Sequence, residues 1–221
     1  MNPQRDIVVG IDLAGSPGRM TGICAMEGKT ILACSYVHTD EEILSFVAAA
    51  GPVLITIDAP LTLPPGRKTL EDRNGEHFRP CDRILLRRGI KFFPITLGPM
   101  RMLTTRGIAL ARLLKRRGIP ALEMYPGAAQ DILNIPRKQH SMVRLRHGLE
   151  RLGLRGIDAS MNGDELDAVT GGYIGVLHLR GLAELIGDER TGGILLPLGL
   201  GRNHRRRTSR RRSSKKGQIR T

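Results

Sequence analysis

The sequence predicts an α/β protein with a mixed sheet, and two observations carry that prediction. Residues 7–11 (IVVGI) and 53–57 (VLITI) are continuous apolar runs rich in β-branched side chains, which is typical of strands buried on both faces. Between them lie two strand patterns, 21–27 and 30–37, joined by a tight turn, and then a helical pattern at 41–50. We therefore expect an antiparallel meander followed by a helical crossover to a parallel strand.

The rest of the chain continues this alternation. Residues 59–100 are rich in Pro, Gly and charge, and we expect them to form an insertion beside the sheet end, with helical character at 82–88. A helix at about 101–117 leads to a short apolar strand at 121–122. The later predicted pieces are basic helical segments in 137–152, a loop at 153–163, a helix from Asp164 to about His178, and a short apolar piece at 194–198.

Length and charge suggest one domain with a basic tail. The 221 residues, 40% of them apolar, suit a single core, and we predict that the domain spans 1–201. Of 35 Lys and Arg, ten lie in the last 20 residues, which contain no Asp or Glu. We expect this tail, 202–221, to be disordered and either to bind the phosphate backbone of nucleic acid or only to aid solubility. The candidate nucleic-acid contacts are Arg205, Arg206, Arg207, Arg210, Arg211 and Arg212.

Several classes of protein lack support in the composition. No apolar run approaches the roughly 20 residues that cross a bilayer, so we expect a cytoplasmic protein without membrane contact. The three cysteines form neither a CxxC pair nor a zinc pattern. Aromatic residues make up only 3%, which favours contacts to a nucleic-acid backbone over stacking on single strands. The oligomeric state stays open.

Acidic residues close the apolar strands. Asp12, Asp58 and Glu123 each follow such a run, and a late helix offers Asp164 and Asp167 on one face. If the first and fourth strands are parallel neighbours, Asp12 and Asp58 lie roughly 5 Å apart at the sheet end where ligands gather. Each acid alone also suits a turn or a helix cap. Together they would repel, and a divalent ion held by oxygen ligands, Mg²⁺ or Mn²⁺, relieves that repulsion.

The order of these motifs resembles a known family. GIDLAG, a strand hairpin, a helix, TIDAP, a long insertion, ALEMYP and GDELDA follow one another as in DUF429, a family of predicted nucleases with a ribonuclease H-like fold. The segments RPCDRILLRRGIKFFP and GDERTGGILLP are similar as well, so that the resemblance spans residues 7–198. It implies a five-stranded mixed sheet of order 3-2-1-4-5 with strand 2 antiparallel and helices on both faces.

The resemblance also implies a function. It indicates a hydrolase of phosphodiesters that uses two Mg²⁺ or Mn²⁺ ions about 4 Å apart. The acids and the basic tail together favour structured or double-stranded nucleic acid as the substrate. By position, Asp12, Asp58, Asp164 and Asp167 are the implied catalytic metal ligands. Glu123 is a further candidate, as an alternative ligand, a neighbour of the ligands or a substrate contact.

Two other functions stay open from the sequence. One is a non-catalytic module that binds nucleic acid or protein on the same fold. The other is an ATP-dependent phosphotransferase, with Gly15 to Gly18 cradling a phosphate, although the chain has room for only one of the two domains that such enzymes use. In the insertion, four residues are candidates to line the site and contact phosphates: Arg79, Cys81, Asp82 and Lys91. A helix cap suits Asp82, and a buried position suits Cys81, at least as well.

Overall fold

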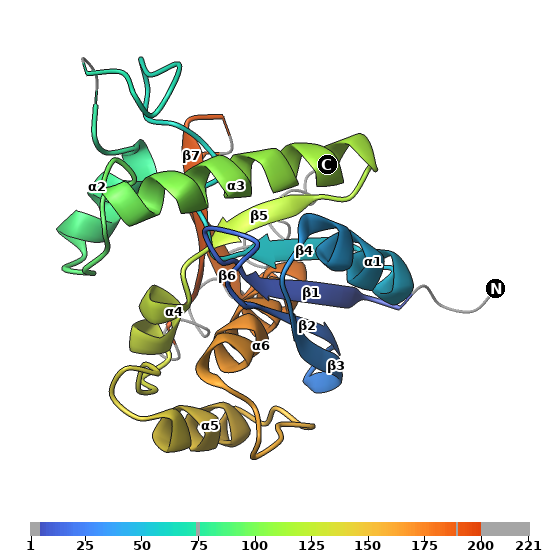
Figure 1. Cartoon of the computed structure of the whole chain (residues 1–221). Coiled ribbons are helices and arrows are strands. Elements are labelled where there is room, and N and C mark those ends of the chain that lie inside the picture. The colour runs from blue at the N-terminus through green and yellow to red at the C-terminus, as the bar shows by residue number, and fades with distance from the viewer. Residues whose placement is uncertain (1–4, 74–75, 189, 200–221) are drawn as a thin grey trace, which may run out of the picture.

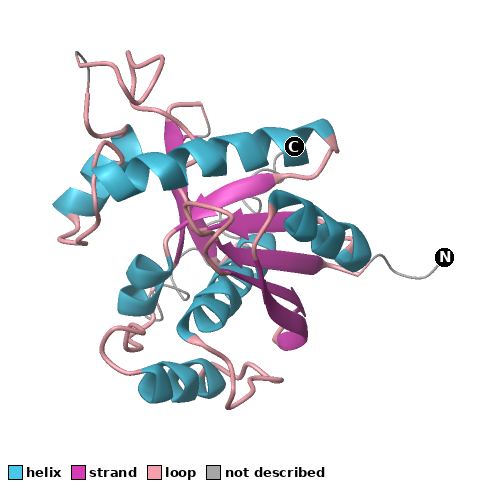
Figure 2. Cartoon of the chain, in the orientation of Figure 1, coloured by secondary structure: helices cyan, strands magenta, loops and turns pink. Residues whose placement is uncertain are grey.

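A mixed sheet with helices on both faces forms the protein, seen in a computed structural model that describes residues 5–73, 76–188 and 190–199. Within these residues the sheet has seven strands in the order β3-β2-β1-β4-β5-β7-β6 (Figure 2). The strands are β1 (Ile7–Asp12), β2 (Thr21–Glu27), β3 (Thr30–Val37), β4 (Leu54–Ile57), β5 (Ala121–Met124), β6 (Ala183–Asp188) and β7 (Gly192–Pro197). The helices are α1 (Asp40–Ala50), α2 (Pro80–Arg87), α3 (Gly98–Arg116), α4 (Pro126–Ile132), α5 (Met142–Arg151) and α6 (Gly163–Leu179).

The two faces of the sheet bury different helices. Helices α1 and α3 lie on one face, where Ile43 and Leu110 pack against Ile11 and Ile55 of the central strands (Figure 1). Helix α6 covers the other face, with α5 beside it (Figure 1). Because successive side chains of a strand point to opposite faces, the continuous apolar pattern of β1 and β4 fills both cores at once. A smaller cluster under α2 and α4 closes the β6–β7 end.

The predicted fold class is confirmed, whereas the predicted strand count is wrong. Strand β1 pairs antiparallel with β2 and parallel with β4, and β4 pairs parallel with β5, which gives the expected order 3-2-1-4-5 with strand 2 antiparallel. Two strands extend this sheet, since β7 pairs parallel with β5, and β6 pairs antiparallel with β7. The sequence of β6, AELIGD, is half exposed at the sheet edge and carries no continuous apolar run.

Helix α4 is the other element that the sequence pattern did not predict. Pro126 stands in its first turn, and the Tyr-Pro-Gly segment resembles a turn even though proline at that position is compatible with a helix. The predicted tail 202–221 and its arginines lie outside the described residues, so the predicted division at residue 201 stays a prediction. None of the described helices has the length and apolar character needed to cross a membrane.

Candidate functional site

Two acids meet at the carboxyl ends of the central parallel strands. Ile11 of β1 and Ile57 of β4 are register partners, and the next residues along each strand are Asp12 and Asp58. The Asp58 backbone N–H donates to the carbonyl of Ile11 at 2.8 Å, so the parallel ladder continues to the acids. Their placement follows from the helical crossover through α1, which makes these two strands neighbours.

Helix α6 brings two more acids to the same place. Its first turn begins at Asn162, whose side chain accepts from the backbone N–H groups of Asp164 and Glu165, while Glu165 caps Asn162 in return. The helix start lies against β2 at Gly22, the partner of Asp12, where a Cβ would stand 2.2 Å from the Asp164 carbonyl oxygen. The absence of a side chain at Gly22 therefore lets α6 approach closely enough to place its acids beside Asp12.

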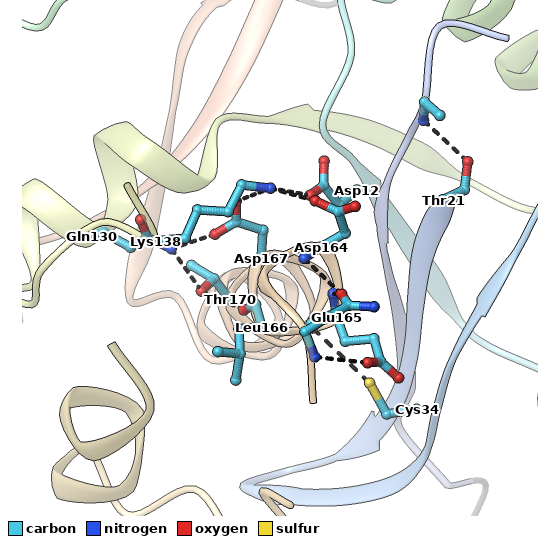
Figure 3. Close-up of polar contacts among 12 residues, drawn as sticks. Asp12, Thr21, Cys34, Gln130, Lys138, Asp164, Glu165, Leu166, Asp167 and Thr170 are labelled. Carbon is cyan, nitrogen blue, oxygen red and sulfur yellow. Dashed lines mark hydrogen bonds and ion pairs between the residues drawn. The ribbon is translucent and has the colours of Figure 1, made fainter. Parts of the chain in front are cut away.

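The ammonium of Lys138 lies among three of these acids. Its Nζ is 2.9 Å from Asp12 Oδ2, 2.6 Å from Asp164 Oδ1 and 3.0 Å from Asp167 Oδ2 (Figure 3). The lysine comes from the segment between α4 and α5, far in sequence from Asp12. We call Asp12, Asp58, Asp164, Asp167 and Lys138 the acid cluster.

Gln130 of helix α4 holds Asp167, the more buried of the two α6 acids. Gln130 donates from Nε2 to Asp167 Oδ1 at 2.7 Å and lies 3.2 Å from the Thr170 hydroxyl (Figure 3). Asp167 thus has one oxygen on Gln130 and the other on Lys138, and its side chain is only 8% exposed. Asp164, by contrast, is 38% exposed and open to solvent.

The acid cluster carries more negative charge than its own lysine balances. Burial raises the pKa of Asp12 to about 7, since the attraction of Lys138 only partly offsets burial and repulsion from Asp167. Burial, followed by repulsion from Asp12 and Asp167, raises the pKa of Asp58 well above its ordinary value. Burial also opposes the charge on Lys138, but Asp12 and Asp167 outweigh it and raise the pKa of the ammonium. Four carboxylates thus share one tethered cation.

The donor set fits a hard divalent ion, although the described residues hold no ready arrangement of three or more Asp, Glu, His or Cys side chains around a metal position. Within the described chain, Asp12 Oδ1 and both carboxylate oxygens of Asp58 accept no hydrogen bond. Both aspartates are partly exposed, so a cation can reach these oxygens from solvent. Oxygen ligands of this kind match Mg²⁺ or Mn²⁺.

Glu123 is held differently. Both of its oxygens accept from Arg79, at 2.6 and 2.7 Å, and the Leu61 backbone N–H donates to one of them at 2.9 Å. The same guanidinium binds Asp82, whose carboxylate also accepts from the Arg79 backbone N–H at 2.8 Å. We call Arg79, Asp82 and Glu123 the Arg79 cluster. Of the four insertion residues that the sequence offered as lining the site, Arg79, Cys81 and Asp82 are buried and Lys91 is exposed.

Two hollows flank the acid cluster. One, of about 320 Å³, is lined by Asp12, Lys138 and Asp164 together with the loop after β1. The other, of about 170 Å³, lies on the Asp58 side between Phe92, Phe93 and Tyr125. The backbone of Ala14 is fixed in the first hollow by Thr21 and by Arg106, which donates to its carbonyl at 2.8 Å. Both hollows give a ligand access to the acids.

Sequence reasoning missed Lys138 and Gln130. Both lie between β5 and α5. Gln130 follows a segment that resembles a turn, and Lys138 is one of many basic residues in its stretch of sequence. The only signal for Lys138 was electrostatic: a predicted cluster of acids needs a cation, and a lysine supplies one as well as a metal does. Nothing in the local pattern singles out Gln130.

Comparison with solved structures gives weak likenesses. RuvC of Thermus thermophilus in complex with a Holliday junction substrate aligns with 13% identity and a TM-score of 0.49, covering 79% of this chain and 96% of that chain. A second structure of Thermus thermophilus RuvC aligns with 14% identity and a TM-score of 0.46, covering 85% and 98%. No curated protein matches the chain significantly.

The family comparison is more direct. The model of the family described as protein of unknown function (DUF429) matches residues 10–135. The matched segment contains Asp12, Asp58, Glu123 and Gln130, and ends before Lys138 and the two aspartates of α6. Because it covers more than half of the 221 residues, this chain belongs to the DUF429 family.

Proposed function

We propose that the protein is a divalent-metal-dependent nuclease that hydrolyses phosphodiesters in structured or double-stranded nucleic acid. One observation carries the proposal: Asp12, Asp164 and Asp167 contact one lysine ammonium, and Asp58 follows the strand next to Asp12 without any hydrogen-bond donor among the described residues. These aspartates would hold Mg²⁺ or Mn²⁺. The ion supplies the activation of a water nucleophile and the neutralisation of charge on the phosphate.

The residues around these acids leave room for a substrate phosphate and hold the metal ligands in place. The partly exposed Asp164 and the hollow beside Asp12 and Lys138 leave room for a phosphate at the cluster. Gln130 keeps the carboxylate of Asp167 in one orientation, which preorganises a metal ligand. Because Glu123 already accepts three hydrogen bonds, its proposed role is to anchor the insertion beside Asp58 rather than to bind the ion directly.

Nucleic acid is the proposed substrate because basic side chains continue from the site along the chain. The segment with Lys138 leads directly into α5, which exposes Arg144 and Arg151 along one open groove that Glu150 also lines. Positive side chains in such a row bind phosphates through charge and counterion release, without reading base sequence. The arginines of the tail, Arg205 to Arg212, are proposed to add to this attraction.

The test is nuclease activity with matched variants. Purified protein with Mg²⁺ or Mn²⁺ should cut labelled duplex or branched DNA or RNA faster than single strands. Asp12→Asn and Asp164→Asn should each lose roughly 100-fold to 1,000-fold, because each removes charge that stabilises the transition state. Asp158→Asn makes the same chemical change at an exposed loop position and should retain full activity.

A second measurement separates the enzyme from a binding module. Mn²⁺ should raise the melting temperature of the wild type and of Asp158→Asn, but not that of Asp12→Asn. Equal cutting by the wild type and both site variants would point to a contaminant and contradict the proposal. Salt-sensitive binding of nucleic acid that depends on neither Asp12 nor metal would instead identify a non-catalytic module.

A further inference from the structure

Lys138 makes contacts that a bound metal ion would otherwise make. Its Nζ meets one oxygen from each of Asp12, Asp164 and Asp167, all within 3.0 Å. It donates hydrogen bonds to Asp12 and Asp164 and forms an ion pair with Asp167. The lysine is therefore bound as a cation among the three acids (Figure 3), and its side chain is 25% exposed.

A glycine at the start of α6 leaves room for the side chain of Lys138. Its methylene groups cross the start of α6 at Gly163, directly before Asp164, where a Cβ would lie 2.9 Å from Lys138 Cδ. Any larger residue at Gly163 would displace the stem of the lysine. Asn162 caps the helix just before this glycine, so the crossing point is held in a fixed backbone. The position of the ammonium is thus built into the fold rather than left to a flexible surface chain.

Lys138 leaves oxygens of the two strand-end acids without a hydrogen bond. Among the described residues, Asp12 Oδ1 and the two oxygens of Asp58 have no hydrogen-bond donor, whereas Asp12 Oδ2 is bound to the lysine. Asp12 therefore has one oxygen bound to the lysine and one without a donor, and Asp58 ends the neighbouring strand. The unused oxygens are enough for one additional cation and belong to the two strand-end acids.

We propose that Lys138 occupies one of the two cation positions of the acid cluster, so that the site binds a single divalent ion through Asp12 and Asp58. This inference rests on the proposed function, and it replaces the two-ion site implied by the family resemblance with one ion and one tethered ammonium. Lys138 is in this view a positioning residue: it holds Asp164 and Asp167 together and keeps a second metal ion out. Unlike a metal ion, it cannot be removed by a chelator.

The test is the number of ions bound, measured by Mn²⁺ titration with electron paramagnetic resonance of the free ion. The full chain should bind about one Mn²⁺, and Lys138→Met about two, with the spin-coupled spectrum of a neighbouring pair appearing only in the variant. Lys138→Arg keeps a positive charge and should again bind about one. Lys115→Met removes the same charge from an exposed site on α3 and should bind about one as well. Unfolding curves of all four proteins establish that each is folded.

The outcomes separate this inference from the proposed function. Two ions bound by the wild type would show that metal displaces the lysine and would overturn the inference alone. One ion in both the wild type and Lys138→Met would also overturn it, since the lysine would then block nothing. No binding by any of the four proteins would overturn the proposed function, and the inference with it.

Discussion

The Arg79 cluster and the acid cluster are built from the same kinds of group and reach opposite results. In the Arg79 cluster one guanidinium serves two carboxylates, and every carboxylate oxygen of Asp82 and Glu123 accepts a hydrogen bond. In the acid cluster one ammonium serves three of four carboxylates, and Asp58 has no donor among the described residues. The formal negative excess is one charge in the first and three in the second when all groups are ionised.

The difference separates a structural ion pair from a site that needs a ligand. Burial of charge is tolerated when geometry and hydrogen bonds compensate it, as the planar fork of Arg79 does for Glu123. The acid cluster lacks that compensation: burial raises the pKa of Asp12, Asp58 and Asp167, and repulsion between carboxylates raises it further. Stability is thereby given up at the place where a cation and a phosphate are proposed to bind.

The largest effect is expected from breaking the Arg79 cluster. Arg79→Met leaves Glu123 and Asp82 buried without their cation and should lower the free energy of unfolding by about 3–5 kcal/mol, as measured by urea denaturation. Arg83→Met is the matched control, because its ion pair with Glu76 is about half exposed and should contribute less than about 1 kcal/mol. Losses of similar size in both variants would show that the buried pair is no more structural than the exposed one.

A smaller effect of opposite sign is expected at the acid cluster. The folded state raises the pKa of Asp12 from 3.8 to about 7, so it binds the proton more tightly than the unfolded chain does. The stability that this proton contributes is fully present below about pH 4 and is lost as the pH rises to about 7. In chelator at about pH 8, Asp12→Asn should therefore be more stable than the wild type by about 1–2 kcal/mol, and the gain should vanish at low pH.

Urea unfolding across this pH range, with one control, checks that sign. Hydrogen bonds from Ser160 lower the pKa of Asp158, so Asp158→Asn should show no gain at high pH. A wild type more stable than Asp12→Asn at about pH 8 without metal would mean that the attraction of Lys138 outweighs the repulsion among the aspartates.

The aspartates of the acid cluster could be predicted from the sequence. Asp12 and Asp58 were predictable as neighbours because the patterns of β1 and β4 are strong and the crossover through α1 leaves little choice of topology. Asp164 and Asp167 followed from their spacing on one helix face. In each case a local pattern and one topological rule were sufficient.

The contacts of Lys138 and the Arg79 cluster depend on long-range packing instead. Lys138 reaches Asp12 across 126 residues, and Arg79 reaches Glu123 across 44, with no periodicity that links either pair. The insertion and the segment after β5 are irregular, so their side chains are placed by tertiary contacts rather than by propensity. Strand β6 was missed for a related reason, because an edge strand needs only one buried face.

The smallest effect concerns reactivity rather than stability. Cys81 lies beside Asp82 in the Arg79 cluster, where burial, partly opposed by the charge of Arg79, raises the pKa of its thiol from 9.0 to about 12. The thiolate fraction at about pH 8 is then roughly a thousandfold lower than for a free cysteine, and buried thiols also exclude reagents. In the native wild type, iodoacetamide should therefore label Cys81 far more slowly than in the unfolded chain, as peptide mass spectrometry measures site by site.

Arg79→Met should also change the labelling rate of Cys81. If the guanidinium keeps the region closed, the variant should label Cys81 at least about tenfold faster than the wild type under native conditions, because the helix that carries it opens more often. Lys138→Met, which disturbs only the acid cluster, should leave the labelling of Cys81 unchanged. Fast labelling in the native wild type would show that α2 opens readily, and that the compensated charges do not close this region against solvent.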